Sequence, residues 1–170
     1  LPYYDSPGRA EAASNSLFID LLGQAREYVW FYTPYLLLGD GLRDAFVRAA
    51  QRGVDIRIIM PGIPDKKLVY RMSRSYYREL LEAGVKVYEY SPGFVHAKAC
   101  LADDCIGLIG TVNLDYRSLY LHYECSAKQK ALFREAVCLT VGAGLLLLGF
   151  LCRKSRREAL LAIAGFQAKS

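Results

Sequence analysis

The stretch FVHAKACLADDCIGLIGTVNLD, residues 94–115, decides both the fold and the chemistry expected of this chain. It carries the pattern H-x-K-x4-D-x6-G-[ST]-x-N, formed by His96, Lys98, Asp103, Gly110, Thr111 and Asn113. Side chains of a β-strand alternate between its two faces, so a strand over residues 94–101 would place His96 and Lys98 on one face. Thr111 and Asn113 repeat this spacing on the next segment. The pattern predicts a nucleophile beside a fixed cation.

This arrangement suits chemistry at a phosphodiester. A neutral imidazole can attack phosphorus to give a phosphohistidine, while an ammonium group and an amide NH2 hold the non-bridging oxygens as charge accumulates. The route requires no metal ion, and the sequence predicts neither a metal site nor another cofactor. The five cysteines form no C-x-x-C pair and the only histidines are His96 and His122, which argues against a zinc site. The cysteines are expected to be reduced, small buried hydrophobic groups.

The motif and the flanking GTVNLDYRSLYLHYE, residues 110–124, resemble the HKD motif of the phospholipase D superfamily. Within it, the chain is most similar to the C-terminal half of bacterial cardiolipin synthases. Four segments carry this resemblance, which covers roughly residues 1–125: YVWFYTPYLLLGDGL, AAQRGVDIRIIMPGIPDKKLV, SYYRELLEAGVKVYEYSPGFVHAK and GTVNLDYRSLYLHYEC.

The resemblance implies a role for each motif residue. His96 would act as nucleophile or acid, Lys98 and Asn113 as phosphate ligands, and Thr111 as a supporting donor. Glu124 would be the carboxylate that orients a catalytic imidazole, whereas Asp103 belongs to the motif with a less direct role. His122 lies two residues before Glu124 and offers an alternative second catalytic histidine.

Helical and extended patterns alternate along the chain, which predicts an α/β fold with a mixed sheet flanked by helices, as one HKD half. We expect helices over residues 11–27, 40–52 and 68–83, with Asp40 as an N-cap and Gly53 as a C-cap. Strands are expected over residues 28–33, 54–60 and 85–90. Arg71, Arg74 and Arg78 would share one helix face, either as an ordinary charged surface or as a strip facing lipid headgroups. Lys66 and Lys67 are expected in a solvated turn.

By resemblance, the reaction transfers a phosphatidyl group from one phosphatidylglycerol to another, giving cardiolipin and glycerol. The expected partners are an anionic phospholipid, a membrane surface and a second HKD half, because the chain has one motif and the chemistry uses two histidines. That half would be a missing N-terminal half or a second copy, and the expected location is the bacterial cell membrane. The alternatives are a homodimeric nuclease and a non-catalytic fragment. The apolar, aromatic WFYTPYLLL favours lipid over nucleic acid.

Composition agrees with a folded protein that handles a membrane or a polyanion. The chain has 170 residues, 53% of them hydrophobic, and a net charge of +5. Residues 126–170 form a divergent tail, and residues 136–152 are uncharged over a length at the lower limit for a transmembrane helix. An anchor, a buried helix and a shifted reading frame all fit this tail. We favour the last two, because the apolar run is short and contains glycines.

Overall fold

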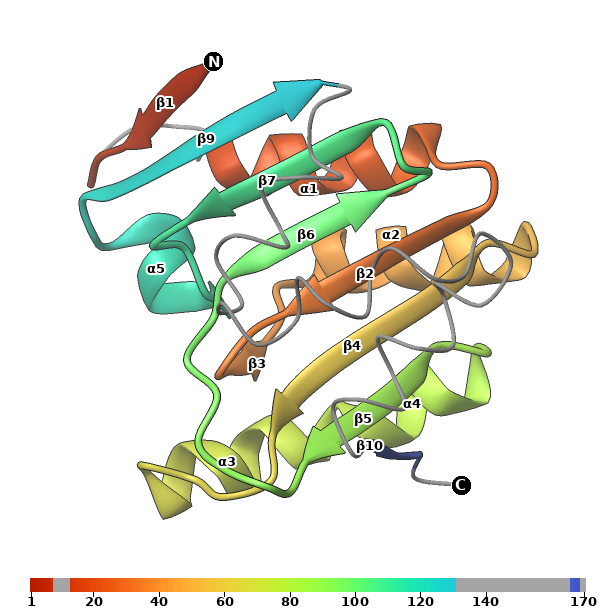
Figure 1. Cartoon of the computed structure of the whole chain (residues 1–170), viewed down its shortest axis with the longest axis vertical. Helices are drawn as coiled ribbons and strands as arrows, with labels where there is room; N and C mark the ends of the chain where they lie inside the picture. The colour runs from red at the N-terminus through yellow and green to blue at the C-terminus, as the bar shows by residue number, and fades with distance from the viewer. Residues whose placement is uncertain (8–12, 131–165, 169–170) are drawn as a thin grey trace, which may run out of the picture.

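The computed structural model describes residues 1–7, 13–130 and 166–168. They form an eight-stranded sheet in the order β1-β9-β7-β6-β2-β4-β5-β10, with a two-stranded sheet β3-β8 at its edge (Figure 1). Strands β2, β4 and β5 run parallel, whereas the remaining pairs of the large sheet are antiparallel. The predicted mixed sheet flanked by helices is therefore confirmed.

The elements follow one another along the chain with short connections. The strands are β1 Pro2–Asp5, β2 Tyr28–Tyr32, β3 Leu36–Leu37, β4 Asp55–Pro61, β5 Lys86–Tyr90, β6 Ala99–Ala102, β7 Ile106–Gly110, β8 Leu114–Asp115, β9 Glu124–Lys130 and β10 Phe166–Ala168. The helices are α1 Ala13–Gln24, α2 Asp40–Gln51, α3 Lys67–Ser75, α4 Tyr77–Glu82 and α5 Tyr116–Tyr120.

Helices α1, α2 and α4 pack on one face of the large sheet and enclose the main core. The period-two alternation of a strand explains how β2 serves both faces. Its Val29 and Phe31 belong to this core, while Tyr28 and Trp30 form a smaller cluster with Ile59 on the opposite face. Because β2 lies in the middle of the sheet and is buried on both faces, it gives the candidate site a rigid support.

The expected helices and central strands are present with shifted ends. Asp40 is the first residue of α2 and pairs with Arg43 at 3.0 Å, so the predicted N-cap is wrong and Gly39 holds that position. Gly53 follows the actual C-cap, Arg52, with a φ of +88° that favours glycine. The helix expected over residues 68–83 is divided at Tyr76 into α3 and α4.

The strand expected over residues 94–101 is wrong at its start, because β6 begins only at Ala99. Its neighbour β2 ends at Tyr32, which is the partner of Ala99, and Pro34 beyond it has no N–H to offer a sheet. Residues 94–98 therefore have no strand beside them on the β2 side. His96 and Lys98 lie in this irregular segment rather than on a strand.

Strand β9 pairs with β1 and β7 and continues to Lys130, beyond the predicted domain boundary at residue 125. Most of the predicted tail, including the apolar run over residues 136–152, lies outside the described residues. No helix within the described part of the chain is long and apolar enough to cross a membrane. Of the cysteines described, Cys100 is buried as expected, whereas Cys105 and Cys125 are exposed and correct that prediction.

Candidate active site

The predicted site residues gather at the edge of the sheet where β2 and β7 end and β6 begins (Figure 1). Thr33, directly after β2, fastens this edge: its Oγ1 donates to the carbonyl of Tyr35 and accepts from the Leu114 N–H at 3.1 Å. The second bond holds the segment after β7 against the end of β2. As a result, residues 94–98 and 111–113 meet at one edge although they belong to different connections.

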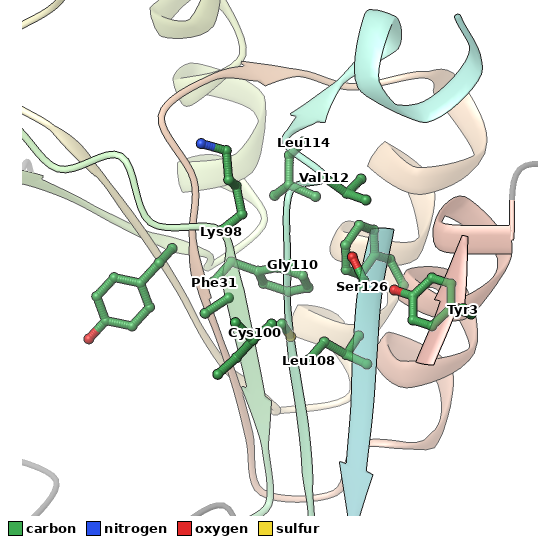
Figure 2. A pocket seen from close by; sticks show the side chains of 13 residues that line it. Tyr3, Phe31, Lys98, Cys100, Leu108, Gly110, Val112, Leu114 and Ser126 are labelled. Carbon is green, nitrogen blue, oxygen red and sulfur yellow. The ribbon is translucent and has the colours of Figure 1, made fainter. Parts of the chain in front are cut away.

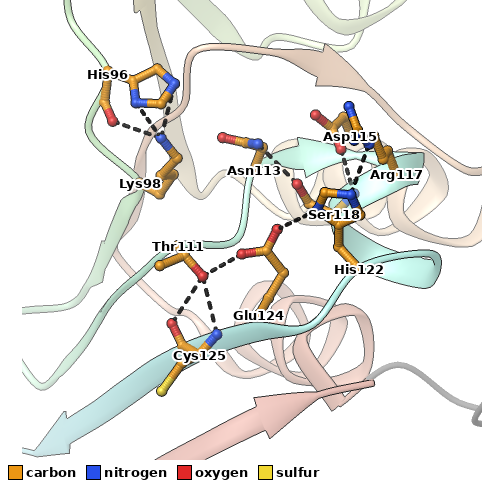
Figure 3. Close-up of polar contacts among 10 residues, drawn as sticks. All are labelled: His96, Lys98, Thr111, Asn113, Asp115, Arg117, Ser118, His122, Glu124 and Cys125. Carbon is orange, nitrogen blue, oxygen red and sulfur yellow. Dashed lines mark hydrogen bonds and ion pairs between the residues drawn. The ribbon is translucent and has the colours of Figure 1, made fainter. Parts of the chain in front are cut away.

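His96 and Lys98 lie in direct contact there. Lys98 Nζ is 2.7 Å from His96 Nδ1 and 3.2 Å from Nε2, and it also donates to the His96 carbonyl at 2.9 Å (Figure 3). An ammonium group can only donate, so the ring nitrogen facing it must offer a lone pair. The contact therefore requires an imidazole without the second proton.

Aromatic neighbours remove water from the His96 ring. Phe94 stacks on it with 5.7 Å between ring centroids, and Tyr35 approaches edge-on at 6.4 Å. This burial lowers the pKa of His96 below its ordinary value, and the positive charge of Lys98 lowers it further. The neutral, nucleophilic form of the imidazole is thereby favoured at neutral pH.

The aliphatic part of Lys98 borders a small pocket between the sheet and α1. Its labelled lining is largely apolar, while the Lys98 ammonium points away from it (Figure 2): Phe31, Cys100, Leu108, Val112 and Leu114. Burial at this position lowers the pKa of Lys98 from its ordinary value. The ammonium group is consequently poorly hydrated and interacts strongly with any anion that reaches it.

Glu124, at the start of β9, connects two other predicted residues. One carboxylate oxygen accepts from Thr111 Oγ1, and the other lies 3.7 Å from His122 Nδ1 (Figure 3). Arg117 Nε donates to His122 Nε2 at 3.0 Å, which leaves Nδ1 to carry the ring proton toward Glu124. Glu124 therefore orients the imidazole of His122, and the structure does not place it on that of His96.

Asn113 is held by α5. Its Nδ2 donates to Ser118 Oγ at 2.9 Å, while its Oδ1 is buried and has no hydrogen-bond partner among the described residues. Ser118 is fixed in turn because its backbone N–H donates to the Asp115 carboxylate, the N-cap of α5, at 2.6 Å. Thr111 and Asn113 thus contact different partners and do not repeat the His96–Lys98 pair.

Asp103 is separated from this cluster. It lies at the opposite end of β6, in the turn to β7, with a φ of 50°. Its carboxylate accepts from the backbone N–H groups of Arg26, Glu27 and Tyr28 at 2.8–2.9 Å. Burial alone would raise the pKa of Asp103, but these three donors bring it below its ordinary value. The geometry gives Asp103 a structural role, tying the hairpin to the start of β2.

Gly110 owes its place in the motif to a close approach of two strands. A Cβ atom at this position would lie 2.5 Å from the carbonyl oxygen of Cys125 and closer still to Ser126 Oγ. Real Cβ atoms do not approach a backbone oxygen so closely, so only glycine lets β7 reach β9 here. That approach allows Thr111 N to donate to the Cys125 carbonyl at 3.0 Å. Thr111 and Glu124 are consequently held together.

Replacing Gly110 with alanine is expected to destabilise the chain by about 3 kcal/mol or more, because the two strands must separate to admit the methyl group. Thermal unfolding followed by circular dichroism measures this loss. Gly23→Ala in α1 is the matched control, since a Cβ there meets nothing within 4 Å and alanine favours a helix. Equal unfolding temperatures for the two variants would contradict the proposed close approach.

Three residues beside His96 were not predicted as part of the site. The Tyr35 hydroxyl donates to the Asp65 carboxylate, and Lys66 Nζ lies 5.5 Å from the centre of the Tyr35 ring. Burial and the Asp65 hydrogen bond raise the pKa of Tyr35 to about 12, so its hydroxyl stays protonated. The position of Tyr35 after a buried strand and a proline was the available signal. Lys66 therefore lies in the immediate surroundings of His96 rather than in an isolated turn.

The described residues contain no group of three or more His, Cys, Asp or Glu side chains placed to hold a metal ion. The groups available for a ligand at this edge are an imidazole, an ammonium, an amide and hydroxyls. All of these groups can bind or attack a phosphate.

Relatives with known names share this sequence. The family described as "Cardiolipin synthase, PLD-like domain" matches residues 18–132. An uncharacterized protein of Streptococcus mutans is 54% identical over 126 residues, which are 74% of this chain and 27% of that protein. A cardiolipin synthase of Alkalihalophilus pseudofirmus is 45% identical over 114 residues, which are 67% of this chain and 23% of that enzyme. The chain thus spans about a quarter of the length of these relatives.

Solved structures of similar fold support the assignment of the architecture. The phospholipase D family member Nuc from Salmonella typhimurium has a TM-score of 0.65 at 17% identity, covering 82% of this chain and 91% of Nuc. A phosphatidylserine synthase from Haemophilus influenzae has a TM-score of 0.62 at 17% identity, covering 99% of this chain and 39% of the synthase. These similarities concern the fold alone. Because the family match extends over most of the chain, the chain belongs to the cardiolipin synthase family of phospholipase D-like domains.

Proposed function

We propose that this chain is the C-terminal catalytic half of a phosphatidyltransferase that makes cardiolipin and glycerol from two phosphatidylglycerol molecules. The observation that carries the proposal is the contact between Lys98 Nζ and the ring of His96, 2.7 Å from Nδ1, in a segment shielded by aromatic rings. It joins a neutral nucleophile to a poorly hydrated cation. Membership of the cardiolipin synthase family supports the choice of lipid substrate.

In the first step, a ring nitrogen of His96 attacks phosphorus, and the bond from phosphorus to the glycerol oxygen breaks. The lowered pKa of His96 supports the role of nucleophile over that of acid, because an acid must first hold the proton. Lys98 must move its hydrogen bonds from the imidazole to the phosphate oxygens, which exposes the lone pair and neutralises the developing charge. The resting contact therefore keeps the nucleophile covered until an anion arrives.

Asn113 can contribute its NH2 group after rotation of the amide. In the resting structure Nδ2 faces Ser118, while the unpaired Oδ1 lies on the side of Lys98 (Figure 3). A hydroxyl both donates and accepts, so a half-turn of the amide lets Ser118 Oγ donate to Oδ1. The same turn directs the NH2 group toward Lys98, where a phosphate oxygen would bind. It also satisfies the buried carbonyl oxygen.

A second histidine must protonate the departing glycerol oxygen and later take the proton from the hydroxyl of the second phosphatidylglycerol. That hydroxyl then attacks phosphorus as the bond to His96 breaks, which releases cardiolipin and restores the imidazole. His122 is occupied by Arg117 and Glu124, and the chain has no other histidine beside His96. We therefore propose a second HKD half as partner and a membrane surface as the place of action.

The proposal is tested in a completed enzyme, in which residues 1–130 replace the matching segment of the Alkalihalophilus pseudofirmus cardiolipin synthase. Vesicles of phosphatidylglycerol are expected to yield cardiolipin and glycerol in equal amounts, as measured by thin-layer chromatography and a glycerol assay. Double-stranded DNA should remain intact under the same conditions. Cleavage of DNA that is lost in His96→Asn, without any lipid product, would support the nuclease alternative and contradict the proposal.

A further inference from the structure

Helix α3 differs from the other long helices because it contributes little to the core. Ser73 is its only buried residue, and its hydroxyl accepts from the Leu36 N–H at 3.0 Å. The opposite side of α3 presents Leu68 and Met72, one helical turn apart, with 71% and 48% of their surfaces exposed. Two large apolar side chains on one exposed helix face are an unusual feature for a surface that meets only water.

Basic side chains surround these two apolar residues. Lys66 and Lys67 stand at the start of α3 and Arg71 lies between Leu68 and Met72, and all three are exposed. None of the three pairs with an acidic side chain of the described residues, although Arg74 and Arg78 further along bridge to Glu89 and Glu82. The exposed face of α3 thus combines unneutralised positive charge with apolar groups. We name this surface, formed by Lys66, Lys67, Leu68, Arg71 and Met72, the α3 patch.

The α3 patch adjoins the candidate active site. Lys66 Nζ lies over the ring of Tyr35, and that ring meets the ring of His96 edge-on at 6.4 Å. The loop before α3 is anchored as well, because Gly62 N donates to the carbonyl of Tyr90 at 2.7 Å. Figure 1 shows α3 beside the segment that leads from β5 to β6 and carries His96. A ligand surface that meets the α3 patch would therefore lie next to the nucleophile.

We infer that the α3 patch docks the protein on a bilayer surface that contains anionic phospholipid. Such a surface takes up apolar side chains at the boundary of headgroups and acyl chains, while the cations beside them meet phosphate groups. A nucleic acid would match the charge of Lys67 and Arg71 but would leave Leu68 and Met72 without a partner. The inference rests on the proposed lipid substrate and adds where the membrane is met. It also explains why the site would open toward membrane-embedded phosphodiesters.

The experiment measures binding of the 170-residue chain to vesicles of phosphatidylglycerol and of phosphatidylcholine by sedimentation, without turnover. Leu68→Ser and Arg71→Glu are each expected to weaken binding to phosphatidylglycerol vesicles about tenfold. The matched controls are Leu1→Ser and Arg48→Glu, which change an exposed leucine on β1's outer edge and an exposed arginine on α2. Both controls should bind like the unmodified chain. Circular dichroism verifies that all four variants are folded.

Unchanged vesicle binding in Leu68→Ser and Arg71→Glu, or equal losses in the two controls, would overturn the inference. It would also be overturned if Arg71→Glu weakened binding to double-stranded DNA alone, or if Leu68→Ser altered only the oligomeric state seen by size-exclusion chromatography. Failure of the proposed function is distinguishable from failure of the α3 patch. A completed enzyme that makes no cardiolipin, with vesicle binding still dependent on Leu68 and Arg71, would remove the reaction and leave the docking surface.

Discussion

His96→Asn in the completed enzyme is expected to lower the rate of cardiolipin formation by at least about 10⁴-fold, because it removes the nucleophile while keeping a polar side chain of similar size. The loss should appear in kcat rather than in KM, since the substrate phosphate is held by Lys98 and Asn113 rather than by the imidazole. Cardiolipin produced per minute from phosphatidylglycerol vesicles gives both constants.

His122→Asn is the matched control, because it removes the other imidazole of this chain. His122 contacts Arg117 and Glu124, so its loss disturbs the support of Thr111 and is expected to reduce the rate by less than about 10²-fold. With labelled phosphatidylglycerol and rapid quenching, the label should remain on the unmodified protein and be absent from His96→Asn. If His122→Asn were the more damaging change and abolished the labelled protein, the nucleophile would have to be reassigned.

The layered fold could be predicted from the sequence because its central elements carry strong local patterns. The apolar run through Ile56, Ile58 and Met60 is typical of a strand buried on both faces, and β4 occupies that place. Strand length was less accessible to prediction. Phe94 and Val95 have the composition of a strand, but the neighbouring strand ends at Tyr32, so the sheet has no partner for them on that side. Local pattern predicted the element, whereas tertiary pairing decided its first residue.

The site could be predicted in part for the same reason. The spacing of two between His96 and Lys98 indicated that they lie together, and the structure brings them together, although by an irregular segment rather than by a strand. The same spacing between Thr111 and Asn113 does not have this effect, because α5 binds Asn113 while Glu124 binds Thr111. Contacts made by a helix that follows the motif leave no periodic signal in the motif.

Asp103 shows a second limit of motif-based prediction. Its presence at a fixed distance from Lys98 suggested a catalytic part, yet four residues of β6 separate the two and carry Asp103 to the far end of the strand. There its carboxylate receives three backbone N–H groups. A motif records every position that the fold requires, and Asp103 and Gly110 are positions required by the backbone. Only contacts in three dimensions separate them from His96 and Lys98.

The 170-residue chain by itself is expected to make no detectable cardiolipin as a monomer. Its His96 can form the phosphohistidine, but no second free imidazole stands opposite to protonate the glycerol oxygen, because His122 is held by Arg117 and Glu124. Loss of general acid catalysis alone lowers a rate by about 10²–10⁴-fold. Sedimentation velocity identifies the monomer, and the same sample is assayed with phosphatidylglycerol vesicles.

Joining the chain to a second half, as in the completed enzyme, is expected to restore turnover, because the two histidines then face the phosphorus from opposite sides. Two copies of this chain would supply the same pair only if they associate. That case is recognised by mixing His96→Asn chains with unmodified chains: activity should fall faster than the fraction of unmodified chains, since each mixed dimer lacks one histidine. In the completed enzyme both histidines belong to one polypeptide, and activity should fall in proportion. Transfer by a chain proven to be a monomer would contradict the need for any partner, and the chemistry would then have to pass through His122.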